Sequence, residues 1–175
     1  MWGLPNQAAI VPLGVAEFDK GQNATTIDVS VIRTCVEVNL IGLVQATTTI
    51  LPLLRASPQA VILNVSTDMA SNALQARPDA KLHVVAYNTS KAAANSYTIA
   101  LAQELKKDGI KVNAVTPGFT TTKLNLFSQG GKTSKQGAEI LLPWALLDKD
   151  GPTCKCCYGI ARQQGVYAGS CRSVY

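Results

Sequence analysis

Apolar residues follow a helical spacing in two long segments of the chain. From Val29 to Arg55 they recur every three or four positions, which predicts a long helix, bent near Pro52. A second helical pattern runs from Tyr87 to Lys107, and Gly109 follows it as a typical C-terminal cap. The sequence therefore predicts two long helices.

Two short runs rich in β-branched residues have the pattern of buried strands. Ala60–Val65 lies between turn-forming residues, and the run 110–116 stops at Pro117-Gly118. Because helices and strands alternate along the chain, we expect an α/β fold with a parallel sheet.

The remaining segments lack clear periodicity. Residues 1–26 are rich in glycine and proline and are expected to form a loop-rich lead-in, and residues 68–86 a polar loop. Residues 119–140 are polar and expected to be mobile, before a short apolar helix around residues 138–147. We predict one domain over residues 1–150 and an irregular, cysteine-rich tail over 151–175.

Charge and cysteine content exclude several classes of protein. The net charge of +5 comes from residues 101–175, but its cations are scattered without aromatic residues between them, so no nucleic-acid partner is expected. No signal-peptide pattern begins the chain, and polar residues interrupt the apolar stretch 36–54, so we expect a cytoplasmic protein without a membrane span. Four of the five cysteines lie in the tail at spacings that match zinc sites poorly, and no metal is expected.

Polar motifs follow both predicted strands. Asn64-Val65-Ser66-Thr67 ends the first, and Thr116-Pro117-Gly118 ends the second. Ligands of parallel α/β sheets bind at the carboxyl ends of the strands, so we expect the chemistry of this protein there.

Tyr87 and Lys91 are four residues apart and share one face of the predicted helix. An unperturbed phenol has a pKa near ~10, and a neighbouring ammonium favours the phenolate and lowers that pKa. A tyrosine tuned in this way exchanges a proton with a substrate oxygen. Taken alone, however, such a pair is common on helix surfaces.

Four motifs, in order, resemble segments of the short-chain dehydrogenase/reductase family, and the resemblance covers about residues 25–150. It implies the C-terminal part of a Rossmann-like, doubly wound parallel sheet that starts just after the family's fourth strand and lacks the first βαβ units. The motifs are Val38-Asn39-Leu40-Ile41-Gly42, Leu63-Asn64-Val65-Ser66-Thr67, Ala86 to Ala93 around Tyr87 and Lys91, and Val112 to Gly118 followed by Thr122.

The resemblance also implies catalytic roles. Tyr87 would be the general acid/base, and Lys91 would lower its pKa and hold the nicotinamide ribose. A hydroxyl of Ser66 or Thr67 would bind the substrate carbonyl oxygen. Thr67 aligns best with the catalytic serine, although the family usually has two serines here. Asn39 would fix a helix kink and a water molecule of a proton relay.

The implied cofactor is NADP or NAD, and the implied substrate is a small carbonyl compound or alcohol. Asn64, Pro117, Gly118 and Thr122 would bind the cofactor together with Tyr87 and Lys91. The Gly-rich turn that binds the dinucleotide phosphates does not occur in this sequence, and Gly130-Gly131-Lys132-Thr133 does not have the spacing of a P-loop.

Two functional hypotheses remain open. The first is an NAD(P)-dependent oxidoreductase of the carbonyl reductase or alcohol dehydrogenase type, impaired by the missing Gly-rich turn. The alternative is a catalytically inactive remnant that acts as a dimerisation or binding module. Either would form homo-oligomers through the two long helices, as the resemblance implies.

Overall fold

The fold is built on a four-stranded parallel sheet. In the computed structural model, residues 7–11, 14–17, 20–80 and 83–157 are described. The strands are β1 (Gln7–Val11), β2 (Ala60–Val65), β3 (Lys111–Val115) and β4 (Lys155–Cys157), and their order in the sheet is β1-β2-β3-β4. Every pairing is parallel, which confirms the predicted α/β fold.

Neighbouring strands in this sheet are also consecutive along the chain. Strands 4, 5 and 6 of a doubly wound sheet with the order 3-2-1-4-5-6 have the same arrangement. The topology therefore agrees with the predicted C-terminal part of a Rossmann-like sheet. The predicted starting point was wrong, because β1 lies within the segment expected to be a loop, and its backbone pairs with β2 from Gln7↔Ala60 to Val11↔Asn64.

The prediction of an irregular tail was also wrong for β4. Its residues have no strand pattern of their own, but the Asn113 side chain on β3 forms hydrogen bonds with the backbone of β4 and of the segment that leads into it. Asn113 accepts a hydrogen bond from Lys155 N (3.0 Å) and donates one to the carbonyl of Pro152 (3.0 Å). The backbone N–H of Cys154 donates to the carbonyl of Val112 at 2.8 Å. Tertiary contacts, rather than local sequence, therefore place this strand.

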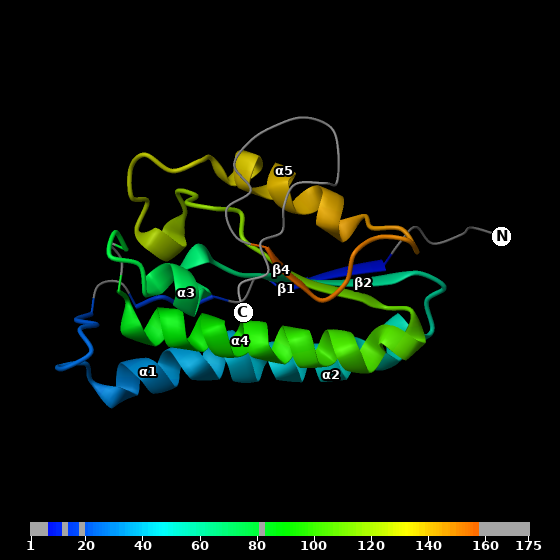
Figure 1. The fold of residues 1–175 in the computed structure, drawn as a ribbon, viewed down its shortest axis with the longest axis horizontal. Helices are drawn as coiled ribbons and strands as arrows, with labels where there is room; N and C mark the ends of the chain where they lie inside the picture. Colours follow the sequence, from blue (N-terminus) through cyan, green and yellow to red (C-terminus); the bar gives the residue numbers. More distant parts are fainter. Residues whose placement is uncertain (1–6, 12–13, 18–19, 81–82, 158–175) are drawn as a thin grey trace.

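Helices cover both faces of the sheet (Figure 1). One face carries α4 (Val85–Leu105) beside the helical stretch formed by α1 (Val29–Val36), the π-helical segment η1 (Glu37–Ile41) and α2 (Gly42–Arg55). The other face carries α5 (Ser134–Ala145). Both predicted long helices are thus present, but the first departs from α geometry at η1 and not at Pro52.

The core has a larger part and a smaller part on opposite faces of the sheet. The larger packs β2 and β3 against α2 and α4, and the smaller packs β2 and β3 against α5. Their buried members are Leu54, Ala60, Ile62, Leu101, Ala102, Leu105, Ile110 and Val112 in the larger part, and Leu63, Val115 and Ala145 in the smaller.

The helical stretch Val29–Arg55 is long and apolar enough to cross a membrane by length and composition alone. The polar interruptions in 36–54 had predicted a poor membrane span. Core helices of soluble proteins meet the same criterion, and one face of this stretch packs on α4.

Short helices lie in the two segments predicted to be loops. They are η2 (Asp68–Ala70) and α3 (Asn72–Gln75) before α4, and η4 (Lys123–Asn125) after β3. The segment after β3 is tied to itself, because Lys132 N donates to Phe119 O (3.0 Å) and Thr121 N donates to Lys132 O (2.9 Å). The first part of the segment 119–140, which was expected to be mobile, is therefore a hydrogen-bonded loop.

Candidate active site

The carboxyl ends of β2 and β3 meet at one edge of the sheet, as their parallel pairing requires. Val65 is in register with Val115, and Ser66 N donates to Val115 O at 2.9 Å. This register brings the polar motif after β2 next to the Pro117-Gly118 turn. Two of the sequence motifs are therefore adjacent in the fold.

Tyr87 and Lys91 lie in the first two turns of α4 and are each only 6% exposed. Gln22, a residue that the sequence analysis missed, holds this end of the helix: its Oε1 accepts hydrogen bonds from the backbone N–H groups of Ala86 (3.0 Å) and Tyr87 (3.4 Å). Its Nε2 donates to the carbonyls of Ala16 and Glu17. No spacing pattern in the sequence connects Gln22 with a helix more than sixty positions away.

Burial controls the protonation of both side chains. It raises the pKa of the Tyr87 phenol to about 12, opposed in part by a hydrogen bond with the Thr67 side chain. Burial also lowers the pKa of Lys91 to about 8. The net pKa of Tyr87 is therefore shifted in the opposite direction to the one expected, because removal of the phenolate from water dominates.

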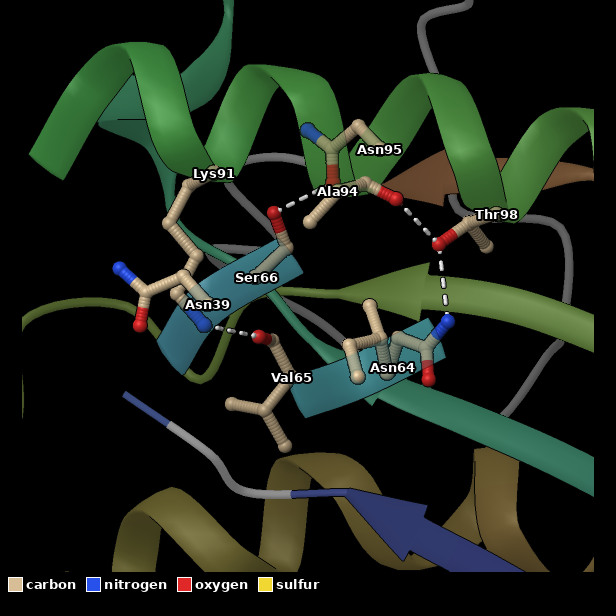
Figure 2. Close-up of a pocket in the computed structure, with 9 residues that line it drawn as sticks. Asn39, Asn64, Val65, Ser66, Lys91, Ala94, Asn95 and Thr98 are labelled. Carbon is tan, nitrogen blue, oxygen red and sulfur yellow. Dashed lines mark hydrogen bonds between the residues drawn. The ribbon is translucent and has the colours of Figure 1, made fainter. Parts of the chain in front are cut away.

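The two hydroxyls after β2 point to different partners. The Ser66 hydroxyl donates to Asn95 Oδ1 on α4 at 2.7 Å (Figure 2). Thr67 is hydrogen-bonded to Tyr87 and also accepts a hydrogen bond from Met69 N at 3.3 Å. Of the two alternatives, Thr67 is the hydroxyl beside the tyrosine.

Asn39 lies inside the π-helical segment η1 and is 1% exposed. Its Oδ1 accepts from Val15 N at 2.9 Å, and its Nδ2 donates to Val15 O (2.9 Å) and to Ser90 Oγ (2.8 Å). This side chain therefore fastens the chain after β1 to both long helices.

A small cavity lies between β2, α4 and η1, with a free volume of about 10 Å³ (Figure 2). A volume near this size holds one water molecule when polar groups surround it. Lys91 is part of the cavity wall, and its Nζ donates a hydrogen bond to the carbonyl of Val65 at 3.2 Å. Asn64 Nδ2 donates to Thr98 Oγ1 at 2.8 Å, and Asn64 Oδ1 is buried without a hydrogen-bond partner among the described residues. The cavity walls are formed by Asn39, Leu43, Asn64, Val65, Ser66, Lys91, Ala94, Asn95 and Thr98.

Gly118 occupies a backbone conformation that requires glycine, with φ at +72°. A Cβ atom added here would lie 2.7 Å from Lys132 Nζ, so the backbone of the turn faces a cation at close range. Gly118 N donates to Thr116 Oγ1, and Thr122 begins η4 through a capping box with Asn125. The predicted cofactor-contact residues Pro117, Gly118 and Thr122 therefore lie in one short loop.

Gly14, in the chain after β1, lies close both to this loop and to the lysine of α4. A Cβ atom added to Gly14 would lie 3.9 Å from both Lys91 Nζ and the Leu124 side chain.

Within the described residues, no group of three or more His, Cys, Asp or Glu side chains could hold a metal.

Comparison with known proteins agrees with this arrangement. The family model "short chain dehydrogenase" matches residues 1–130. Salutaridine reductase from Papaver somniferum is 30% identical over 157 residues, covering 68% of this chain and 49% of that protein. Estradiol 17-beta-dehydrogenase 2 from Rattus norvegicus is 31% identical over 141 residues, covering 81% of this chain and 32% of that protein.

Solved structures show the same fold. The structure of salutaridine reductase from Papaver somniferum matches with a TM-score of 0.67 and 24% identity, covering 84% of this chain and 70% of that one. Carbonyl reductase Sniffer of D. melanogaster matches with a TM-score of 0.72 and 21% identity, covering 86% and 62%.

The fold is a parallel α/β domain of Rossmann type. The chain belongs to the short-chain dehydrogenase family. It spans about half, or less, of the length of the two curated relatives.

Proposed function

We propose that this protein is an NAD(P)-dependent oxidoreductase that interconverts a carbonyl group and a secondary alcohol. The observation that carries the proposal is the hydrogen-bonded pair of Thr67 and Tyr87 at the carboxyl end of β2, one helical turn from Lys91. An acid/base group and a second hydroxyl beside it can bind one substrate oxygen from two directions.

In the reduction direction, the Tyr87 phenol donates a proton to the carbonyl oxygen as that oxygen gains negative charge. The Thr67 hydroxyl donates a hydrogen bond to the same oxygen. A pKa of about 12 keeps the phenol protonated at neutral pH, which suits a proton donor. In the oxidation direction Tyr87 must first lose this proton, so we expect reduction to be the faster direction near neutral pH.

Lys91 supports the proton transfer by its charge. With a pKa of about 8, its amine is mostly an ammonium at pH 7. When Tyr87 gives up its proton, this buried ammonium stabilises the phenolate that remains. The cavity beside Lys91 and Asn39 has room for the water molecule of a proton relay.

The residues after β3 fit the nicotinamide end of a dinucleotide. The Gly118 turn leaves its backbone uncovered by any side chain of its own, and Lys132 Nζ lies beside it. Lys91 would hold ribose hydroxyls, and Pro117, Gly118 and Thr122 would contact the carboxamide. Asn64, which was also predicted to bind the cofactor, donates a hydrogen bond to Thr98 on α4. The bound cofactor would supply the hydride.

The proposal is tested by titration with NADPH and NADH, followed by cofactor fluorescence, and by reduction of a panel of carbonyl compounds. We expect saturable binding of one of the two cofactors and consumption of it with a carbonyl substrate. Tyr87→Phe should keep the binding and lose most of the reduction. No binding of either cofactor, or full activity of Tyr87→Phe, would contradict the proposal.

A further inference from the structure

The end of β2 is attached to α4 at four consecutive residues. Each has a partner on the helix face that carries Tyr87, and three of the four bonds are drawn in Figure 2. The pairs are Asn64 with Thr98 (2.8 Å), the Val65 carbonyl with Lys91 Nζ (3.2 Å), Ser66 with Asn95 (2.7 Å), and Thr67 with Tyr87.

The pair of Ser66 and Asn95 is the shortest of the three measured bonds and is fully enclosed. Ser66 is 8% exposed and Asn95 is 6% exposed. Asn95 lies one helical turn beyond Lys91 and two beyond Tyr87, so it is on their face of the helix. Asn95 therefore holds the hydroxyl of the residue that directly precedes Thr67.

Two bonds fix the position of Ser66, and Thr67 follows it directly. The Ser66 N–H is bonded to β3 through Val115 O (2.9 Å), and its hydroxyl is bonded to α4 through Asn95. Thr67 is extended (φ −148°, ψ 150°) and begins η2, so its own side chain is the N-cap of the next helix. The position of the Thr67 hydroxyl thus depends on where Ser66 is held.

We propose that Asn95 is a positioning residue: through Ser66 it sets the distance between the Thr67 hydroxyl and Tyr87, and it keeps the Ser66 hydroxyl turned away from the substrate. This inference rests on the proposed oxidoreductase function. A displacement of a reacting group by ~1 Å lowers a rate by on the order of a hundredfold. Loss of the Asn95 bond should therefore lower kcat by about ten- to a hundredfold.

Leu101 offers a control on the same helix. It lies six residues beyond Asn95, is 6% exposed, and packs in the larger part of the core. A Leu101→Ala variant removes buried apolar contacts of α4 without removing a hydrogen bond of Ser66. We expect it to lower stability and leave kcat within about twofold of the wild type.

The first experiment is a double-mutant cycle on kcat with Asn95→Leu, Thr67→Val and the double variant. If Asn95 acts through Thr67, Asn95→Leu lowers kcat in the wild-type background and changes the KM for the cofactor little. In the Thr67→Val background, Asn95→Leu has little further effect on kcat. Equal losses from Asn95→Leu in both backgrounds, or an equal loss from Leu101→Ala, would mean that Asn95 only fills the core.

The second experiment needs no enzymatic activity. Tyrosine labelled with ¹³C at Cζ gives a resonance for Tyr87 that is assigned by its loss in Tyr87→Phe. We expect Asn95→Leu and the smaller change Ser66→Ala to shift this resonance at pH 7, and Leu101→Ala to leave it in place. An unshifted resonance in both Asn95→Leu and Ser66→Ala would refute the positioning role, whereas an inactive wild type with the expected shifts would refute only the proposed function.

Discussion

Tyr87 and Lys91 are equally buried, and burial moves their pKa values in opposite directions, to about 12 and about 8. Removal from water disfavours the charged form of each group, which is the phenolate for tyrosine and the ammonium for lysine. Near neutral pH the site therefore holds a protonated phenol beside a mostly protonated amine. This is the charge state that a carbonyl reductase requires of its proton donor.

The rate of carbonyl reduction should depend on the protonation of Lys91. As pH rises through about 8, the ammonium loses its proton and no longer stabilises the phenolate left by proton transfer. We expect kcat to fall above pH 8, measured between pH 6 and 10 with saturating cofactor. Lys91→Arg keeps its charge over this range, so its profile should not show that fall. A wild-type profile that stays level to pH 10 would contradict the assigned role.

Burial of the Lys91 charge also lowers the stability of the fold. Its pKa falls from 10.5 to about 8, so the cost of holding the ammonium is fully present below pH 8. Between pH 8 and 10.5 the unfolded chain binds more protons than the folded one, and stability rises with pH. We expect Lys91→Met to be more stable than the wild type at pH 7, by of order 3 kcal/mol, and this difference to shrink toward pH 10.5.

Urea unfolding at pH 7 and at pH 10 measures this effect. Lys149→Met, a change at an exposed lysine, serves as the control and should show no such trend. A stability difference for Lys91→Met that is the same at both pH values would contradict the prediction.

Several properties of individual residues could be predicted from the sequence. The four-residue spacing places Tyr87 and Lys91 on one helix face, and parallel strand ends explain why Ser66-Thr67 approaches the tyrosine. The family resemblance favoured Thr67 over Ser66, but local pattern alone could not show which hydroxyl faces Tyr87, because Asn95, which holds Ser66, is 29 positions away. It also could not show the direction of the Tyr87 pKa shift, which depends on burial by the assembled fold.

At the scale of elements, η1 joins α1 and α2 and presents Asn39 to the chain after β1. Three hydrogen bonds of one amide connect Val15, Ser90 and the π-helical segment. Regular α geometry is interrupted at the position where this side chain is needed, as is frequent at functional sites. The segment therefore connects the sheet with the helix that carries Tyr87.

Replacing Asn39 should destabilise the whole domain. Asn39→Leu leaves the Val15 N–H and carbonyl without their side-chain partner, and each lost partner of a buried polar group costs ~1–3 kcal/mol. We expect a loss of roughly 2–5 kcal/mol in the free energy of unfolding, measured by urea denaturation. Thr49→Ala, at an exposed hydroxyl on α2, should change it by less than ~0.5 kcal/mol. Equal effects of the two changes would contradict the role assigned to Asn39.

The sequence predicted the long helices and the two central strands, and it missed the outer strands. β2 and β3 are buried on both faces and have the apolar runs typical of such strands. β1 was hidden in a glycine- and proline-rich segment, and β4 has only three residues, held by Asn113. Edge strands like these depend on partners that are distant in sequence, which a local pattern cannot reveal.

At the scale of the molecule, α1 and α2 lie on the outside of the fold beside α4 (Figure 1). Large apolar side chains on this helical stretch face solvent: Val29 is 56% exposed and Leu53 is 68% exposed. The family resemblance implies pairing of subunits through these helices and α4. A contact between two copies of the chain would cover such exposed apolar side chains.

We predict that the protein forms a homodimer through this face, measured by sedimentation equilibrium at micromolar concentration. Leu53→Asp places a charge in the contact and should shift the protein toward the monomer. Leu142→Asp, a change at a 55% exposed leucine of α5 on the other face of the sheet, should leave the dimer intact. A wild-type monomer, or equal effects of the two changes, would contradict this arrangement.

The π-helical segment also explains a spacing in the sequence. Along α1, η1 and α2 the buried side chains recur at every fourth position, as Val31, Cys35, Asn39, Leu43 and Thr47. In a regular α-helix each step of four residues turns ~40° past a full rotation, so four steps would carry Thr47 ~160° away from Val31. The wider turn of η1 accommodates one more residue, which takes back ~100° of that rotation. The buried residues spaced by four can therefore stay closer to one side of the stretch because the helix unwinds locally at η1.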